Sequence, residues 1–239
     1  MNAPLLGTLN NFRMKKYAVI VAGGSGSRMG SQLPKQFLLI HQKPILWYTL
    51  HTFLKSYKDI YLIVVLPAEY YETGRAICDE FQPLNPIQTV VGGDKRFHSV
   101  REGLSLIQDP SVIFVHDAVR CLLTPSLIHL CFEETIQFGS AIPCIESKDS
   151  VRILEETGNR AVKRTDVKLV QTPQTFLSEL LLPSYQAAYL DSFTDDAAVV
   201  EAANHPIHLV NGEENNIKIT SPLDLITAEK LLDPPLHSL

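Results

Sequence analysis

A glycine-rich segment near the N-terminus has the residue types of a phosphate-binding loop. Val21-Ala22 ends an apolar run that leads into Gly23-Gly24-Ser25-Gly26-Ser27-Arg28-Met29-Gly30, with Pro34-Lys35-Gln36 just beyond. Glycines let the backbone approach a ligand closely, and successive N–H groups can then contact phosphate oxygens. Arg28 and Lys35 would neutralise the negative charge of such a ligand. The segment therefore predicts a binding loop for a phosphorylated molecule.

Two common phosphate-binding loops do not match this segment. A Walker A loop requires Lys and then Ser or Thr directly after its last glycine, and no lysine stands there. A dinucleotide fingerprint requires a third glycine where Met29 stands, and an acid about 20 residues further on for the ribose. No acidic residue occurs before Asp59. What remains is a glycine loop flanked by two cations, or a structural turn beside two solvated cations.

The charge distribution favours a small polyanion as the ligand. The net charge is −5, yet residues 1–60 carry eight Lys and Arg side chains and one acid, Asp59. That quarter therefore has a charge of +7, and the remainder has −12. A nucleic-acid-binding domain is usually basic throughout, so the pI of 5.9 argues against that class. A basic quarter that contains a glycine loop fits a nucleoside triphosphate.

Two further motifs end short runs rich in Val and Ile. They are Gly92-Gly93-Asp94 and His116-Asp117-Ala118-Val119-Arg120. Ligand loops of parallel sheets follow the carboxyl ends of the strands, where such motifs would meet. Asp117 and Arg120 could bracket a hydroxyl and a phosphate, or form an ion pair without chemistry. His116 is expected to be a hydrogen-bonded strand-end histidine rather than a catalyst.

Apolar runs alternate with amphipathic segments along residues 15–232, which predicts a single α/β domain. The expected strands are 17–22, 60–66, 87–91, 112–115, 141–145 and 207–210, with a short strand at 216–220 that contains Lys218. The expected helices are 44–57, 68–81, 97–107, 125–138, 175–190, 195–203 and 222–232. This order indicates a Rossmann-like open, mostly parallel sheet with helices on both faces. Residues 1–14 are expected to be a flexible leader and 233–239 a flexible tail.

Residues 147–168 interrupt this alternation. Two runs of alternating polar and apolar residues flank Gly158-Asn159, and a glycine-containing dipeptide there predicts a β-hairpin turn. A two-stranded ribbon with little apolar content is only marginally stable alone in water. We therefore expect this β-arm to protrude and to pack against a second copy of the chain, forming a homodimer.

Composition and cysteine spacing suggest a cytoplasmic protein. The longest apolar stretch, Ile60–Leu66, is far shorter than the about 20 residues of a membrane span. The first apolar run is too short for the core of a signal peptide. The four cysteines contain no C-x-x-C pair, so they are expected to be buried thiols: Cys78, Cys121, Cys131 and Cys144.

Taken together, these motifs resemble the signature of the sugar-phosphate cytidylyltransferases. The first part is Ala-Gly-Gly-x-Gly-x-Arg-Met-Gly, beginning at Ala22, with Pro34-Lys35-Gln36 downstream. The match continues, in order, through Gly92-Gly93-Asp94, Ser99, His116–Arg120, Thr172-Pro173-Gln174, Thr194-Asp195 and Asn216–Thr220. It covers nearly all of residues 16–232. Val119 and Cys121 depart from the Ala and Pro that are usual in the family.

The resemblance implies a role for each group of site residues. The implied catalytic cations are Arg28, Lys35 and Lys218. The implied CTP-binding residues are Ala22, Gly23, Gly24, Ser25, Gly26, Gly92, Gly93, Asp94, Ser99 and Ala118. The implied acceptor-binding residues are Asp117, Arg120, Ser150, Arg164 and Thr194, with Arg164 reaching the acceptor phosphate of the neighbouring subunit. Mg²⁺ or another divalent cation is the implied cofactor, and no residue is assigned as its ligand.

The reaction implied by the resemblance is transfer of a cytidylyl group from CTP to a sugar-alcohol phosphate, with release of pyrophosphate. The implied acceptor is 2-C-methyl-D-erythritol 4-phosphate, of the non-mevalonate isoprenoid pathway. Ribitol 5-phosphate or ribulose 5-phosphate is the alternative acceptor. A non-catalytic nucleotide or sugar-phosphate binding module is the alternative from another class, although it would be expected to lack Arg28 or Lys35. Neither nucleic acid nor a membrane is an expected partner.

Overall fold

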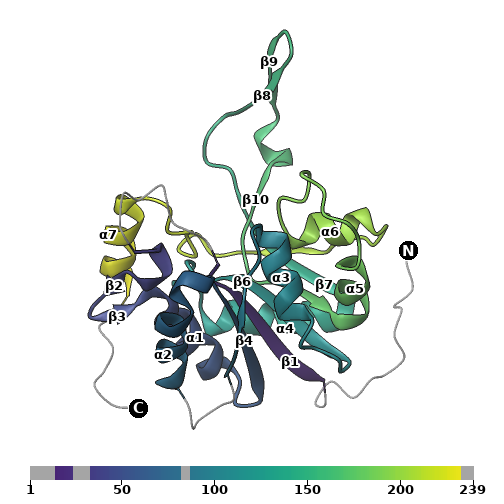
Figure 1. Ribbon diagram of the computed structural model, residues 1–239. Helices are drawn as coiled ribbons and strands as arrows, with labels where there is room; N and C mark the ends of the chain where they lie inside the picture. Colours follow the sequence, from purple (N-terminus) through teal and green to yellow (C-terminus); the bar gives the residue numbers. More distant parts are fainter. Residues whose placement is uncertain (1–13, 24–32, 82–86, 233–239) are drawn as a thin grey trace.

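The computed structural model describes residues 14–23, 33–81 and 87–232. Within them, eight strands form one large sheet in the order β10-β7-β11-β6-β1-β4-β5, and β12 also pairs with β7 (Figure 1). The strands are β1 (Lys15–Val21), β4 (Ile60–Leu66), β5 (Ile87–Val91), β6 (Ser111–Asp117), β7 (Ser140–Glu146), β10 (Lys168–Val170), β11 (Gln174–Leu177) and β12 (Leu209–Asn211). A separate short pair joins β2 (Leu39–Ile40) and β3 (Lys43–Pro44).

The parallel strands β6, β1, β4 and β5 form one half of the sheet. In the shared register, Val19 of β1 lies beside Ile63 of β4 and Val115 of β6. These three side chains are buried, as expected for parallel strands covered on both faces. β-branched residues suit this environment, because their restricted side chains pack well on a pleated surface.

Two hydrophobic cores lie on opposite faces of the sheet, because alternate residues of β1 point to opposite sides. Ala18 and Ile20 belong to one core and Tyr17 and Val19 to the other. The helices are α1 (Ile45–Ser56), α2 (Tyr71–Asp79), α3 (Arg96–Leu104), α4 (Pro125–Phe138), α5 (Ser178–Ser184), α6 (Asp196–Ala202) and α7 (Pro222–Leu231). The first core takes residues from α1, α2, α4 and α7, and the second from α3, α5 and α6. The predicted α/β fold with helices on both faces is confirmed.

The helix expected over 175–190 is wrong at both ends. Gln174–Leu177 form β11, which runs antiparallel between β6 and β7, and the helix α5 covers only Ser178–Ser184. All four residues of β11 are buried. Thr175 and Phe176 are good strand formers, and pairing on both sides satisfies the backbone of this short segment.

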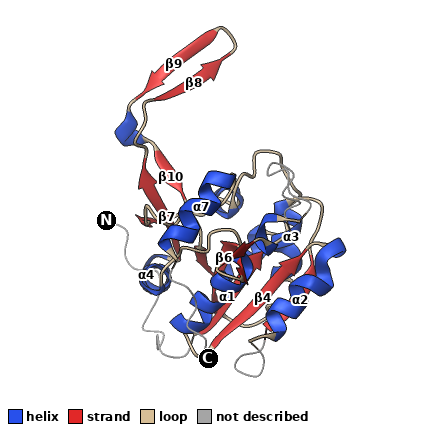
Figure 2. Cartoon of the chain, turned by 90° about the vertical axis from the view of Figure 1, so that its left-hand side faces the viewer, coloured by secondary structure: helices blue, strands red, loops and turns tan. Residues whose placement is uncertain are grey.

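The predicted arm is a hairpin that stands away from the rest of the chain (Figures 1 and 2). Its strands, β8 (Val151–Glu155) and β9 (Gly158–Val162), pair with each other and form a sheet of their own. The turn falls at 156–157, two residues earlier than expected, and Gly158 follows it with φ of +120°. Glycine is favoured at such a φ because a side chain would be strained there. Leu154 in this hairpin is 83% exposed, so the arm has an apolar side chain without cover within its own chain.

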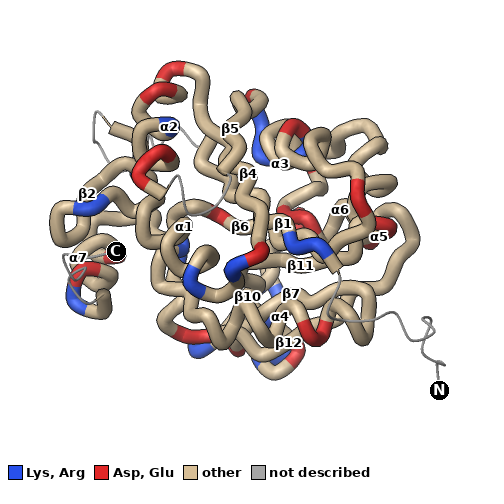
Figure 3. The backbone as a smooth tube through the Cα atoms, turned by 90° about the horizontal axis from the view of Figure 1, so that it is seen from below, with Lys and Arg blue, Asp and Glu red and all other residues tan. Residues whose placement is uncertain are grey.

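The basic N-terminal quarter does not gather its charge at one place (Figure 3). Lys15 is paired with Asp109, Lys16 with Asp59 and Lys43 with Glu80, all at N···O distances of 2.6 to 2.8 Å. Among the described residues of this quarter, much of the positive charge is therefore matched locally. The charge asymmetry alone therefore does not show which of these cations would meet a ligand.

The other compositional predictions concern cysteines and membrane spans. All four cysteines lie in the described residues, where they are buried and form no disulfide. Among the described helices, none is both long and apolar enough to cross a lipid bilayer.

Candidate active site

In the parallel half of the sheet, the order in which the chain adds strands reverses at β1. The chain passes from β1 outward to β4 and β5, and β6 then returns to the other side of β1. In open α/β sheets, ligands bind outside the carboxyl ends of the strands at such a switch point. The backbone N–H of Ala22 donates to Val65 O at 2.9 Å, and that of Ala118 donates to Val21 O at 3.1 Å. Ala22 and Ala118, both predicted CTP-binding residues, therefore lie together at this edge.

Three predicted CTP-binding glycines surround Ser99 and its neighbour His98. A Cβ atom on Gly92 would lie 2.7 Å from Ser99 Oγ, and one on Gly23 would lie 3.1 Å from it. A Cβ atom on Gly93 would lie 2.5 Å from His98 Cβ. The Ser99 hydroxyl donates to Gly93 O at 3.3 Å. Side chains at these positions would fill the space at the strand ends, so glycine is required here for close packing.

The other predicted CTP-binding residues are Asp94, which follows the second glycine pair, and residues of the first glycine loop. Asp94 is exposed and its carboxylate is hydrogen-bonded to His98 Nδ1. The predicted Gly24, Ser25, Gly26 and Arg28 lie outside the described residues. The structure thus brings the predicted CTP-binding residues that it describes together at one sheet edge.

Lys35 and Gln36 attach a short 3₁₀ turn, η3 (Lys35–Phe37), to this edge. Gln36 Nε2 donates to Ala22 O at 2.5 Å, so the side chain of Gln36 holds the start of the glycine loop. Lys35 Nζ donates to Thr220 O at 3.3 Å, and the residue is only 8% exposed. Lys35 therefore lies between the nucleotide side of the edge and the segment that carries Lys218.

The segment 216–220 is irregular, so the short strand expected there is wrong. Its contacts go to the turn after β6 rather than to a neighbouring strand. Ile219 N donates to Val119 O at 3.0 Å, and Arg120 Nη1 donates to Asn216 O at 2.8 Å. Asn216, which is fully buried, donates through Nδ2 to Thr172 O at 2.8 Å. These side-chain bonds replace a strand ladder and place Lys218 at the carboxyl end of β6.

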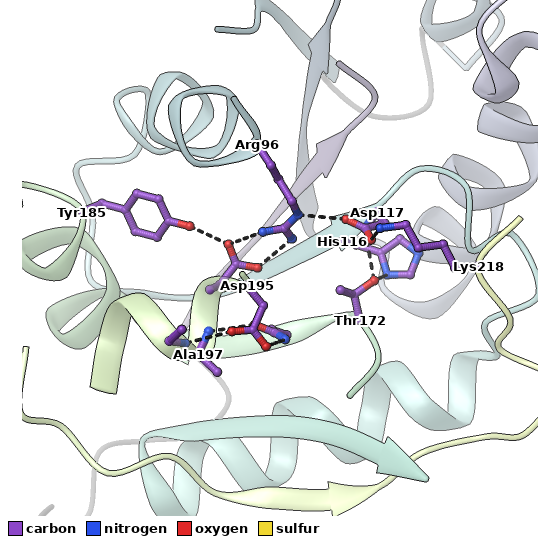
Figure 4. A network of polar contacts seen from close by, with 11 residues as sticks. Arg96, His116, Asp117, Thr172, Tyr185, Asp195, Ala197 and Lys218 are labelled. Atoms are coloured by element: carbon purple, nitrogen blue, oxygen red, sulfur yellow. Dashed lines mark hydrogen bonds and ion pairs between the residues drawn. The ribbon is translucent and has the colours of Figure 1, made fainter. Parts of the chain in front are cut away.

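Asp117 lies between two cations (Figure 4). Its Oδ1 accepts from Arg96 Nε at 3.1 Å, and its Oδ2 is 2.8 Å from Lys218 Nζ. Burial opposes ionisation of Asp117, but Arg96, Lys218 and then Arg120 outweigh it and hold the pKa of this carboxyl well below its usual range. The ion pair considered between Asp117 and Arg120 is replaced by pairs with Arg96 and Lys218. Asp117 is thus a fixed, negatively charged group at the site.

His116 is a structural histidine, as the sequence suggested. It is fully buried, with Nε2 3.2 Å from Arg120 O and Nδ1 3.1 Å from Thr172 Oγ1. Because a carbonyl can only accept, Nε2 carries the proton and Nδ1 accepts from the Thr172 hydroxyl. That hydroxyl oxygen in turn accepts from Asp117 N at 3.1 Å. Burial lowers the pKa of His116 to about 3, so the ring stays neutral and fixes the backbone on both sides of Asp117.

The burial of neutral His116 predicts that the free energy of unfolding falls as the pH is lowered. An unfolded histidine takes up a proton near pH 6.5, whereas folded His116 does so only near its pKa of about 3. Between these values the unfolded state binds one more proton, so the free energy of unfolding falls by about 1.4 kcal/mol per pH unit as the pH decreases. In urea denaturation at several pH values, His116→Asn is expected to lose this contribution. His129→Asn, at an exposed position, controls for the substitution, and an unchanged pH slope in His116→Asn would contradict the prediction.

The predicted acceptor residues fall into two groups. Asp117 and Arg120 lie at the end of β6, and Thr194 directly precedes Asp195, the N-cap of α6. Asp195 accepts from Gln174 Nε2 at 2.9 Å, and Gln174 Oε1 accepts from Ala197 N at 2.8 Å. Gln174 of the Thr172-Pro173-Gln174 motif thus contacts Asp195 of the Thr194-Asp195 motif. This contact fixes the position of Asp195, which directly follows Thr194.

The second group of acceptor residues, Ser150 and Arg164, lies on the arm. Ser150 immediately precedes β8, and Arg164 begins the 3₁₀ turn η5 (Arg164–Asp166) after β9. Arg164 Nη1 donates to Lys148 O at 3.1 Å, and both arm positions are exposed. The arm that carries these residues projects away from the sheet (Figures 1 and 2), and the side-chain bond of Arg164 goes to Lys148 near the start of the arm.

Sequence reasoning missed several residues that organise the site. Arg96 stands two positions after Asp94 and reaches both Asp117 and Asp196. Asp196 follows Asp195 in a pair of acids, and it is fully buried. The one available signal was the proximity of these residues to recognised motifs. Their partners are up to 100 positions away, so spacing could not reveal the contacts.

A parallel sheet with glycines packed close to Ser99 at its strand ends, and with a lysine and an ion-paired carboxylate at the switch point, has the features of a nucleotide-binding α/β enzyme. Comparison with known proteins agrees with this class. The sequence model of the 2-C-methyl-D-erythritol 4-phosphate cytidylyltransferases matches residues 17–234. The chain belongs to the 2-C-methyl-D-erythritol 4-phosphate cytidylyltransferase family.

Individual relatives support this placement over the whole match. Proteins described as 2-C-methyl-D-erythritol 4-phosphate cytidylyltransferases from Bacteroides thetaiotaomicron and Bacteroides fragilis are 44% and 45% identical over 219 residues. Each alignment covers 92% of this chain and 100% of the relative. A crystal structure of 4-diphosphocytidyl-2C-methyl-D-erythritol synthase from Anaerococcus prevotii has a TM-score of 0.79 at 27% identity, covering 91% of this chain and 97% of that one. The Thermus thermophilus cytidylyltransferase has a TM-score of 0.70 at 29% identity, covering 91% and 98%.

Proposed function

We propose that this protein transfers a cytidylyl group from CTP to 2-C-methyl-D-erythritol 4-phosphate and releases pyrophosphate. One structural observation supports this proposal. The predicted nucleotide residues Gly23, Gly92 and Ser99 meet at the same sheet edge as the ion pair between Asp117 and Lys218. A phosphate donor and a phosphate acceptor could therefore be held side by side, as a transfer reaction requires.

The chemistry follows from the charges of the two substrates. A phosphate oxygen of the acceptor attacks the α-phosphorus of CTP, forming a P–O bond while the bond to pyrophosphate breaks. Negative charge grows on the non-bridging and leaving oxygens, so catalysis depends on positioning and electrostatic stabilisation. Lys35, Arg28 and Lys218 would supply positive charge to these oxygens. The acceptor phosphate is already ionised, so no strong general base is needed.

A divalent cation such as Mg²⁺ fits this site only if the nucleotide brings most of its ligands. Among the described residues, no group of three or more His, Cys, Asp or Glu side chains could hold a metal ion. Asp117 already contacts Arg96 and Lys218 through its two oxygens, and Asp94 contacts His98. Mg²⁺ commonly binds substrate phosphates together with one or two carboxylates. Asp117 could join such a set only by giving up one of its two ion-pair contacts, and the bound ion would neutralise charge on the triphosphate.

A homodimer would complete the acceptor side. We propose that residues 15–232 form one domain whose arm, 147–168, packs on a second copy of the chain and lends it Ser150 and Arg164. The support is the separation of the arm from its own site, together with exposed apolar side chains at Ile153 and Leu154. A guanidinium suits phosphate because it can donate two parallel hydrogen bonds.

The assay that tests the function measures pyrophosphate release with defined pairs of nucleotide and acceptor. The expected result is turnover with CTP and 2-C-methyl-D-erythritol 4-phosphate, and at least about tenfold lower kcat/KM with ribitol 5-phosphate or ribulose 5-phosphate. Preference for ribitol 5-phosphate or ribulose 5-phosphate would replace the acceptor and keep the reaction class. Binding of CTP without turnover on any acceptor would instead identify a binding module.

Nucleotide choice gives a separate prediction. CTP is expected to exceed UTP and ATP by about 100-fold or more in kcat/KM, because backbone groups near Gly92 and Gly93 can read the polar edge of cytosine at close range. The control is Ser105→Ala, which changes an exposed side chain at the C-terminal end of α3. Gly92→Ala should raise the KM for CTP, since its Cβ would lie 2.7 Å from Ser99 Oγ. Equal use of ATP and CTP would contradict the assignment of this loop.

A further inference from the structure

Arg96 is held more firmly than an ordinary surface arginine. Its Nη1 and Nη2 atoms donate to the two oxygens of Asp196 at 2.9 and 2.8 Å, in a bidentate pair. Its third nitrogen, Nε, donates to Asp117 Oδ1 at 3.1 Å. Bidentate pairs fix the plane of the guanidinium as well as its position. The direction of Nε toward Asp117 is therefore set by Asp196.

The side chain of Asp196 is itself held in place by burial and by a further hydrogen bond. Its side chain is fully buried, and its Oδ1 also accepts from the Tyr185 hydroxyl at 2.6 Å. A buried carboxylate is costly unless it is paired and hydrogen-bonded, and here both of its oxygens are satisfied. Asp196, Arg96 and Asp117 thus form a chain of contacts that ends at Lys218 on the far side of Asp117 (Figure 4). We call these residues, with Tyr185, the Arg96 network.

The Arg96 network connects the two sides of the site. Arg96 begins α3, and Ser99, which packs against Gly23 and Gly92, lies on the next part of the same helix. Asp196 begins α6, two positions after Thr194. An arginine with only a structural task could be satisfied by Asp196 alone. The additional contact to Asp117 joins the pair formed by Arg96 and Asp196 to a residue at the sheet edge where the reaction is proposed to take place.

We propose that Arg96 is a positioning residue for the acceptor side, and that it acts by holding the Asp117 carboxylate in one orientation between itself and Lys218. The inference rests on the proposed function, since Asp117 is there an acceptor-binding residue. Lysine cannot replace Arg96 fully, because an ammonium group cannot keep a bidentate pair with Asp196 and also direct a donor toward Asp117. Without that donor, Asp117 is free to turn toward Lys218 alone.

Steady-state kinetics of single and double variants test this role. Arg96→Lys is expected to raise the KM for the acceptor about tenfold, with the KM for CTP changed less than about twofold. In an Asp117→Asn background, the same substitution should change the acceptor KM less than about twofold, because Arg96 acts through Asp117. Arg101→Lys is the matched control, since Arg101 lies on the same helix and stacks over Phe97 instead. It should leave both KM values unchanged.

Tyr185→Phe keeps the test decisive if Arg96→Lys does not fold. It removes one hydrogen bond to Asp196 and leaves every charge of the Arg96 network in place. We expect a smaller rise in the acceptor KM, about threefold, which also disappears in the Asp117→Asn background. A role confined to the stability of α3 would disturb the Ser99 side and raise the KM for CTP as much as that for the acceptor.

Three outcomes would overturn the proposal. The first is an equal rise in both KM values, and the second is an effect of Arg96→Lys that is the same with and without Asp117. The third is an unchanged acceptor KM in folded Arg96→Lys. Failure of the proposed function is distinct from all of these, because the parent protein itself would then release no pyrophosphate with CTP and any acceptor, and the positioning role would fall with it.

Discussion

Replacing Lys35 with alanine is expected to lower kcat by about 100-fold or more, on the order of 3 kcal/mol of transition-state stabilisation. The Lys35 ammonium group is nearly buried and contacts the carbonyl of Thr220, beside the segment that carries Lys218. A cation fixed in such a place needs little reorganisation when charge develops on the α-phosphate. Arg28→Ala is expected from the sequence to cause a loss of similar size. Both are measured as kcat with saturating CTP and acceptor.

Controls separate this electrostatic effect from a loss of folding. Lys55→Ala removes an exposed lysine in the last turn of α1 and should leave kcat unchanged. Denaturant unfolding of each variant shows whether the fold survives. A loss of less than about fivefold in folded Lys35→Ala and in folded Arg28→Ala would show that these cations do not stabilise the transition state.

Arg164→Ala should raise the acceptor KM by about tenfold or more and leave the KM for CTP nearly unchanged, because Arg164 is proposed to contact only the acceptor phosphate of the other subunit. The structure places Arg164 on the exposed arm, with its guanidinium near the backbone of Lys148. Arg160→Ala is the matched control, since Arg160 lies on the same arm and pairs with Glu155. It should leave both KM values near those of the parent.

Mixing two impaired variants, assayed at an acceptor concentration below the KM of Arg164→Ala, tests whether the site is shared. An Arg164→Ala chain and an Arg28→Ala chain, after subunit exchange, should form heterodimers with one intact composite site, so part of the lost activity returns. Sedimentation establishes whether exchange and dimerisation occur. Full activity in a monomer would disprove the shared site. Demonstrated exchange without recovery of activity would place the action of Arg164 within its own chain.

Local signals allowed the sequence to predict much of the fold. Helix 125–138 was predicted with its observed bounds because its ends are marked by residues with known conformational preferences. Thr124 caps the N-terminus through Leu127 N, Pro125 occupies the first position, and Gly139 ends the helix with φ of +86°. Strands 60–66 and 87–91 were equally clear, since both are runs of β-branched and apolar residues.

Long-range pairing was the part that the sequence could not supply. β11 is a strand because β6 and β7 offer it hydrogen bonds on both sides, and the β6 partners lie about 60 positions earlier in the chain. The same limit applied to the site. Gly23, Gly92 and Lys35 belong to recognisable local motifs, whereas the pairing of Arg96 with Asp196 joins residues 100 positions apart. The charge asymmetry of residues 1–60 could not show which cations serve a site, because Lys15, Lys16 and Lys43 meet acids elsewhere in the chain.

The order of the site residues along the chain bears on how the protein is made. β1, β4, β5 and β6 all lie within residues 15–117, so the nucleotide side of the sheet can fold while the ribosome is still adding later residues. Arg96 and Asp117 are present at that stage, but Asp196 and Lys218 are translated later. A nascent chain therefore has a nucleotide cradle before it has a complete pair of cations around Asp117. The contact between Lys218 and Asp117 can form only after synthesis has passed the segment 216–220.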